Sequence, residues 1–116
     1  MQDSIRRLLM EKRDLLRQSV EMIRAQTSAG IGGGPLGFAE LPLANLKVLN
    51  VDLELTQSRN ERIAIREKML REARSIEESS RADRASGVES PMPLREAQLL
   101  RLDYQIKLEE EKAKKG

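Results

Sequence analysis

Glycine and proline occur in only two stretches of this chain, 30–42 and 87–93, apart from the terminal Gly116. Both residue types disfavour a helix interior, glycine because its backbone is too free and proline because it lacks an N–H group. Their distribution leaves three segments that can form helices: 4–29, 42–86 and 93–114. The middle segment is long enough for one helix of about 45 residues, roughly 65 Å in length.

The composition favours helices in all three segments. Of the 116 residues, 34% are charged and only 2% are aromatic, namely Phe38 and Tyr104. A core built without aromatic residues must consist of aliphatic side chains, methionine and alanine, which suits helix packing better than a β-sandwich. Richness in Ala, Glu, Lys, Leu and Arg is typical of long helices.

The first segment shows a heptad pattern. Its apolar residues recur in pairs every seven residues: Leu8–Leu9, Leu15–Leu16 and Met22–Ile23. This spacing places one apolar stripe along a helix and is typical of coiled coils. After this segment, Gly30 fits the left-handed residue that ends a helix, and Ile31 fits the apolar residue that folds back onto the last turn.

Three parts of the chain are open to other interpretations. The middle of the long segment, 56–62, is entirely polar, so it is either a break or an exposed part of one helix. The runs 51–55 and 102–108 alternate between apolar and polar residues, as strands do. We favour helices there, because both runs continue into Glu-, Arg- and Lys-rich sequence without a turn residue. We expect the end of the chain, 109–116, to be a solvated tail.

The chain also reads as two copies of one pattern. Residues 25–31 align with 82–88, after which Pro42-Leu43 aligns with Pro93-Leu94. Each copy is a helix, a glycine stop, a loop, a proline start and a second helix, and a single hairpin of this kind cannot bury its own apolar stripe. We therefore predict an all-α fold of antiparallel helical hairpins, with two short helices packed along one long central helix. It would be a single domain, 1–116, with repeat 1 at about 4–56 and repeat 2 at about 61–113.

This pattern resembles the helical repeat of TolC-like outer-membrane efflux proteins, over roughly residues 20–112. The matching positions in the second copy are Gly87, Val88, Leu94, Ala97, Leu99, Leu100 and Ile106. The weaker matches in the first copy are Gly30, Ile31, Leu43, Leu46, Leu49 and Leu55. The resemblance implies a helical scaffold of TolC-like type and a periplasmic location. It extends to none of the barrel strands of that family, and transport does not follow from it. Without the resemblance, a cytoplasmic location is the default.

The residue types argue against catalysis. The chain has no histidine and no cysteine, and no nucleophile–base pair can be picked out from its Ser and Asp residues. The glycine-rich stretch 30–37 lacks the Lys and Ser/Thr that complete a phosphate-binding loop. We therefore expect no enzyme activity, no cofactor, no metal site and no small-molecule substrate. We also expect no signal peptide and no transmembrane segment in this chain.

One basic helix face supports a second hypothesis. Arg59, Arg62 and Arg66 share a face, as nucleic-acid or anionic-membrane binding would require. Glutamates are interleaved with them, however, and 21 basic residues face 19 acidic ones in the whole chain. An ion-paired, solvated face is the simpler interpretation.

We predict that the chain works through a protein partner or by self-association, as a scaffold or oligomerisation module. The loops would supply contacts through Leu36, Phe38, Val88 and Met92, the first two of them exposed. A third possibility is a periplasmic sensor or efflux-accessory domain of a larger protein. The residues expected to pack in the apolar seam are Leu9, Leu16, Ile23, Leu49, Leu53, Ile63, Leu70, Ile76, Leu99, Leu102 and Ile106.

Overall fold

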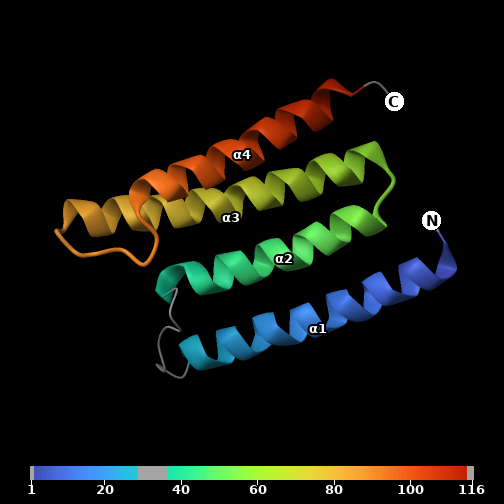
Figure 1. The fold of residues 1–116 in the computed structure, drawn as a ribbon, viewed down its shortest axis with the longest axis horizontal. Helices are drawn as coiled ribbons and strands as arrows, with labels where there is room; N and C mark the ends of the chain where they lie inside the picture. The colour runs from blue at the N-terminus through green and yellow to red at the C-terminus, as the bar shows by residue number, and fades with distance from the viewer. Residues whose placement is uncertain (1, 29–36, 115–116) are drawn as a thin grey trace.

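The computed structural model describes residues 2–28 and 37–114, which form four α-helices and a short 3₁₀ turn (Figure 1). These elements are α1 (Asp3–Ser28), η1 (Gly37–Ala39), α2 (Glu40–Leu55), α3 (Arg59–Ala85) and α4 (Leu94–Ala113). Across these described ranges there is no strand, so both alternating runs are helical. The prediction of an all-α fold with antiparallel helices packed on one another is confirmed.

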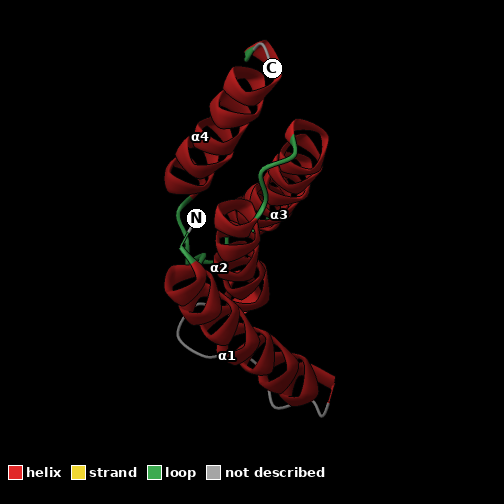
Figure 2. Ribbon diagram, turned by 90° about the vertical axis from the view of Figure 1, so that its right-hand side faces the viewer, coloured by secondary structure: helices red, strands yellow, loops and turns green. Residues whose placement is uncertain are grey.

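The four helices form one open layer in chain order. α1 packs on α2, α2 also packs on α3, and α3 also packs on α4, while α1 contacts neither α3 nor α4. Figure 2 shows the helices following one another across the layer without closing into a ring. The molecule measures 49 × 33 × 17 Å, and its radius of gyration of 15.9 Å exceeds the ~13 Å of a compact domain of about 100 residues.

The long central helix is interrupted, which corrects the prediction of one continuous helix. Residues 56–58 separate α2 from α3, and the chain reverses there, so that α3 runs back along α2. Ser58 caps the new helix, because its side-chain oxygen accepts a hydrogen bond from the backbone N–H of Glu61 at 3.4 Å. The polar segment has no apolar stripe to hold a straight helix against a neighbour, whereas the reversal lets α2 and α3 bury their apolar faces together.

Gly87 follows the end of α3, as the predicted glycine stop of the second copy, and it is left-handed, with φ of +72°. The N–H of Val88 donates to the carbonyl of Asp83 at 2.9 Å, and the N–H of Gly87 donates to that of Arg84 at 3.2 Å. This pair of bonds is a Schellman motif, which satisfies carbonyls that the helix itself leaves without partners. The left-handed cap predicted at Gly30 and Ile31 lies outside the described residues.

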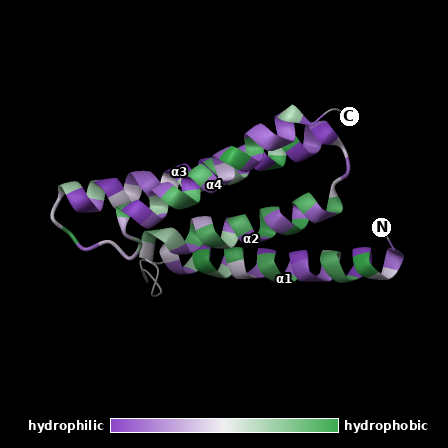
Figure 3. Ribbon diagram, turned by 45° about the horizontal axis from the view of Figure 1, so that its top comes forward, coloured by the Kyte–Doolittle hydropathy of each residue, from purple (hydrophilic) through white to green (hydrophobic). Residues whose placement is uncertain are grey.

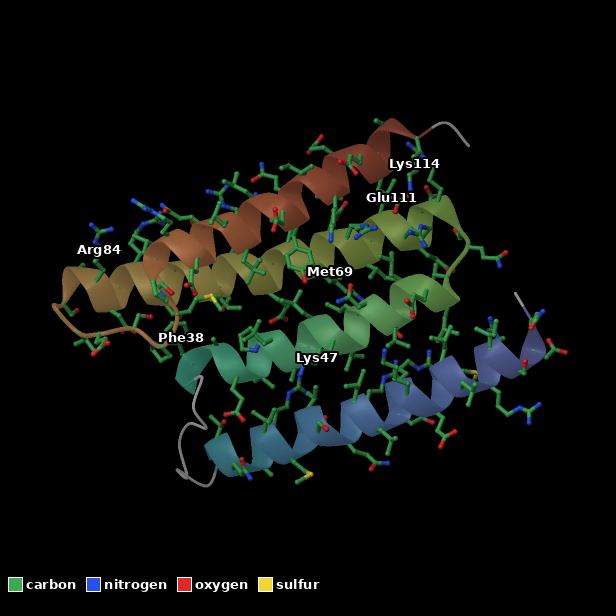
Figure 4. The ribbon with its side chains drawn as sticks, in the orientation of Figure 1. Phe38, Lys47, Met69, Arg84, Glu111 and Lys114 are labelled. Atoms are coloured by element: carbon green, nitrogen blue, oxygen red, sulfur yellow. The ribbon has the colours of Figure 1, made fainter. Side chains whose placement is uncertain are left out.

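The core is a narrow strip between α2, α3 and α4. One cluster of buried residues consists of Ala39, Ile76 and Ala97. A second consists of Leu46, Leu53 and Met69, with Tyr104 of α4 packed against it. Met69, labelled in Figure 4, is completely buried, as is Ile76. Both of these residues lie on α3, so α3 is the centre of the packing.

The predicted packing residues divide into three groups. Leu53, Leu70 and Ile76 are buried. The partly buried ones are Leu9, Leu16, Ile23, Leu49 and Ile63. Leu99, Leu102 and Ile106 are 57%, 41% and 53% exposed, so the prediction that they are packed was wrong. The reason is that α4 packs on α3 through the opposite side of the helix, where Ala97 and Leu108 are buried.

Candidate interaction surface

The outer helix α1 carries an uncovered apolar stripe. Ile5, Leu8, Leu15 and Met22 are 47–64% exposed, and we call them the α1 stripe. Leu8, Leu15 and Met22 are seven residues apart and therefore share one side of the helix. Each is followed in sequence by a partly buried residue of the α2-facing side. Figure 3 shows hydrophobic residues recurring along α1. The apolar surface of α1 is thus broader than α2 covers.

The other outer helix, α4, has apolar residues on two opposite sides. Ala97, Tyr104 and Leu108 face the core. Leu99, Leu102 and Ile106, which we call the α4 stripe, share the other side at spacings of three and four residues. Because 3.6 residues make one turn, the α4 stripe lies roughly opposite the buried side. A helix with two apolar sides is built to contact two sets of neighbours. In the described layer the backbone of α4 packs closely on α3 alone, and Tyr104 reaches the residues of α2 from the same side.

A buried carboxylate joins α4 to α3. Glu111 is only 3% exposed and accepts hydrogen bonds from the Nε atoms of Arg62 at 3.1 Å and Arg66 at 3.4 Å. Figure 4 shows Glu111 and Lys114 near the C-terminal end of α4. Burial acts to raise the pKa of Glu111, but the positive charges of Arg62, Lys114 and Arg66 outweigh it, and the pKa is lowered. The expectation that Glu111 lies in a solvated tail was therefore wrong, because its side chain is buried against α3.

A second carboxylate fixes the middle of α4. Glu77 of α3 is 6% exposed and is held by Arg101 through two bonds, of 3.0 and 3.3 Å, and by Arg81 at 3.3 Å. The hydrogen bond from Arg101 is the main reason that the pKa of Glu77 is lowered, although burial opposes it. Two charged clusters thus set the rotation of α4 on α3, and with it the direction in which the α4 stripe points.

The predicted basic face is occupied by contacts within the molecule. Arg59 donates to the carbonyl of Lys114 at 3.0 Å and to that of Lys112 at 2.6 Å. Arg62 donates to the carbonyls of Leu53 at 2.8 Å and Thr56 at 3.2 Å. Arg59 and Arg62 therefore cap the C-terminal ends of α4 and α2, where the helix dipole favours a positive charge. The binding role of Arg59, Arg62 and Arg66 stays a prediction, but these contacts give them a structural one.

The loop residues that we predicted to make contacts differ in exposure. Leu36 lies outside the described residues. Phe38 and Met92 are half-buried against the cluster around Ile76, so the expectation that Phe38 is exposed was wrong. Val88 is 57% exposed. Gly37 and Pro91 lie so close that a Cβ on Gly37 would be 3.1 Å from the Cγ of Pro91, so the two loops meet at the same end of the layer.

An open groove of about 810 Å³ runs over α2, between α1 on one side and α3 on the other. Val20, Val48 and Leu49 form its apolar part. The charged residues that line it are Arg17, Glu21, Arg24, Lys68, Arg71 and Glu72. Arg24 pairs with Glu21 at 3.5 Å, and Arg17 lies 3.9 Å from Asp52. The groove lies on α1 beside the residues that face α2, away from the α1 stripe.

The described residues contain no group of three or more Asp or Glu side chains placed to hold a metal ion. None of the helices between residues 2 and 114 is both long and apolar enough to cross a membrane.

No family model, no curated protein and no solved structure matches this chain. The likeness to the TolC-like repeat therefore rests on the quoted residues alone.

The sequence did not reveal the α4 stripe as a surface. Its three residues have the spacing of a core-facing side, and so do Ala97, Tyr104 and Leu108 on the other side of the same helix. A pattern of two apolar sides does not say which one faces inward. Glu111 distinguishes the two sides. It lies on the side of Ala97, Tyr104 and Leu108, and it forms ion pairs with two arginines of α3.

Proposed function

We propose that this chain is a non-enzymatic helical scaffold that works by self-association through its exposed apolar stripes. The observation that supports this most strongly is that both outer helices of the open layer carry large apolar residues at helical spacing. Seven residues of the α1 and α4 stripes are 41–64% exposed. Single exposed apolar side chains are normal on protein surfaces, but contiguous apolar surfaces commonly mark interaction sites.

The open layer fits this role. Each helix of a closed four-helix bundle packs on two or more neighbours. In the described structure α1 packs on α2 alone, and α4 packs on α3 with only Tyr104 reaching α2. Association of two copies along either outer helix would bury the stripe of that helix. The TolC-like helical scaffold is a finer form of the same proposal. Its support is the repeated order of helix, glycine stop, loop and helix in 4–56 and 61–113.

The experiment is sedimentation equilibrium with light scattering over a wide range of protein concentration. We expect a mass that rises from one chain to a defined multiple of 13.2 kDa, because apolar burial drives the association. A mass of one chain at all concentrations up to the millimolar range would overturn the proposal.

The nucleic-acid or anionic-membrane alternative has weaker support. Arg62 and Arg66 retain only 25% and 15% of their side-chain exposure and already bind Glu111. A phosphate would have to displace that carboxylate. Binding of DNA or of anionic vesicles that weakens steeply with salt, and that is lost on replacement of Arg59 by Glu, would favour this alternative over self-association.

A further inference from the structure

The α4 stripe continues at both ends into opposite charges. Arg95 precedes Leu99 by four residues, on the same side of the helix, while Glu109 and Glu110 follow Ile106 by three and four residues. All three charged side chains are exposed. Among the described ion pairs, none includes Arg95 or Glu110, and Glu109 has only an exposed contact of 4.0 Å with Lys112. The outer side of α4 is therefore an apolar strip with a positive end and a negative end.

Such a strip is complementary to itself when two copies run antiparallel. Arg95 and Glu109 lie at equal distances along the chain from Leu102, seven residues on either side. A two-fold axis beside Leu102 therefore sets Arg95 of each copy opposite Glu109 of the other, with Glu110 next to it. Leu102 then faces Leu102 across the axis, and Leu99 lies beside Ile106. The charged residues and the apolar residues therefore favour the same register of the two antiparallel α4 helices.

The α1 stripe offers no comparable match. An axis beside Leu15, the midpoint between Leu8 and Met22, sets Lys12 opposite Gln18 and Glu11 opposite Ser19. No pair of opposite charges forms in that register. Charge complementarity thus selects α4 over α1 as the self-pairing helix, although the exposed apolar residues of both are similar in size and exposure.

We propose that two copies of this chain associate across a two-fold axis at Leu102, with their α4 helices antiparallel and Arg95 of each copy paired with Glu109 and Glu110 of the other. An interface of this kind is isologous, so it closes after two chains and does not propagate. This inference rests on the proposed self-association and names its surface, register and stoichiometry.

Cysteine cross-linking tests the register, because the natural chain contains no cysteine. Under mild oxidation we expect the Leu102→Cys chain to form a disulfide dimer at least about tenfold faster than the Leu15→Cys chain, because a disulfide requires Cα atoms within ~7 Å. Leu15 is the matched control, since it is an exposed leucine at the centre of the other stripe. Circular dichroism of both variants confirms that the helices are retained.

Charge reversal tests the end contacts independently. We expect Arg95→Glu alone, and Glu109→Arg with Glu110→Arg alone, each to weaken dimerisation by on the order of tenfold, because two symmetric contacts become repulsive. An equimolar mixture of the two variants should regain dimerisation as a heterodimer, in which both contacts are attractive again. A general loss of folding would not be rescued by mixing.

Three outcomes separate this inference from the proposed function. A dimeric natural chain that cross-links through Leu102→Cys and is rescued by mixing supports both. A natural chain that associates, but cross-links equally fast through Leu15→Cys or shows no rescue, overturns the α4 dimer and leaves the scaffold proposal standing. A natural chain that stays monomeric at all concentrations overturns both.

Discussion

The buried carboxylates Glu77 and Glu111 show how single residues decide the position of a whole helix. Each is held by at least two basic side chains, and each bridges α3 to α4. Replacing a buried ion pair by apolar residues is often neutral, but removing one partner leaves a buried charge uncompensated. These residues therefore fix the rotation of α4 more than they add to the total stability.

Both carboxylates make stability depend on acid pH. Their folded-state pKa lies below the ordinary value of 4.5, so the folded protein binds their protons less readily than the unfolded chain does. The stability that they contribute is fully present above the unfolded pKa and is lost as the pH falls through the folded pKa. We expect the free energy of unfolding in urea to decrease steadily below pH 4.5.

The control for this prediction is the Glu77→Gln, Glu111→Gln double variant. It should be less stable than the natural chain at pH 7 and should lose less stability on acidification. Equal slopes of unfolding free energy against pH for the two proteins would show that other carboxylates are responsible.

The left-handed backbone of Gly87 leads us to expect that replacing this glycine lowers the stability of the protein. Its φ of +72° is unfavourable for residues with a Cβ, and an added Cβ would meet no atom within 4 Å. The Gly87→Ala variant should therefore lose about 1 kcal/mol of unfolding free energy, from backbone strain alone. Gly87→Asn should lose less, because asparagine tolerates this conformation better. Equal losses in the two variants would argue against strain as the cause.

At the scale of the element, the interruption between α2 and α3 sets the fold. A continuous helix would hold the two hairpins apart, whereas the reversal at residues 56–58 brings Leu46 and Leu53 of α2 against Met69 of α3. Arg62 stabilises the reversal at residues 56–58, because it caps the end of α2 and also binds Glu111 of α4. One arginine thus links three helices.

The helix cap formed by Ser58 at the start of α3 can be tested by substitution. Ser58→Ala removes the side-chain acceptor for the Glu61 N–H and should lower the free energy of unfolding by about 1 kcal/mol. The matched control is Gln57→Ala, an exposed neighbour outside both helices, which should change stability little. Ser58→Asp should retain most of the stability, because aspartate is also a good cap. Thermal and urea denaturation would measure all three.

The sequence predicts the outer ends of the helices well, because glycine and proline act locally. Gly87 and Pro93 mark the end of α3 and the start of α4 within a residue. The inner break was left open. Ser58 and Glu61 have the spacing of a capping box, and this signal could have located it. The direction of the α4 stripe depends on partners far along the chain, such as Glu111 with Arg62, and so lies beyond any local pattern.

At the scale of the whole molecule, the open layer predicts a distinctive shape. At dilutions where the chain is monomeric, small-angle X-ray scattering should give a radius of gyration near the 15.9 Å of the structure. A closed four-helix bundle of this length would give ~13 Å, and a continuous rod of about 65 Å roughly 20 Å. A value close to either limit would contradict the layer, and circular dichroism in parallel would show that the helices remain folded.

The open layer also implies that the four helices differ in how easily each one unfolds locally. With a thickness of 17 Å, the molecule has no deep interior, and α1 is held by α2 alone. Native-state hydrogen exchange should therefore show backbone amides of α1 exchanging through local opening, while those of α3 around Met69 and Ile76 exchange only on global unfolding. If protection were uniform over the four helices, they would form one cooperative unit. The expected gradient instead makes α1 an arm that can detach while the remaining three helices keep their core.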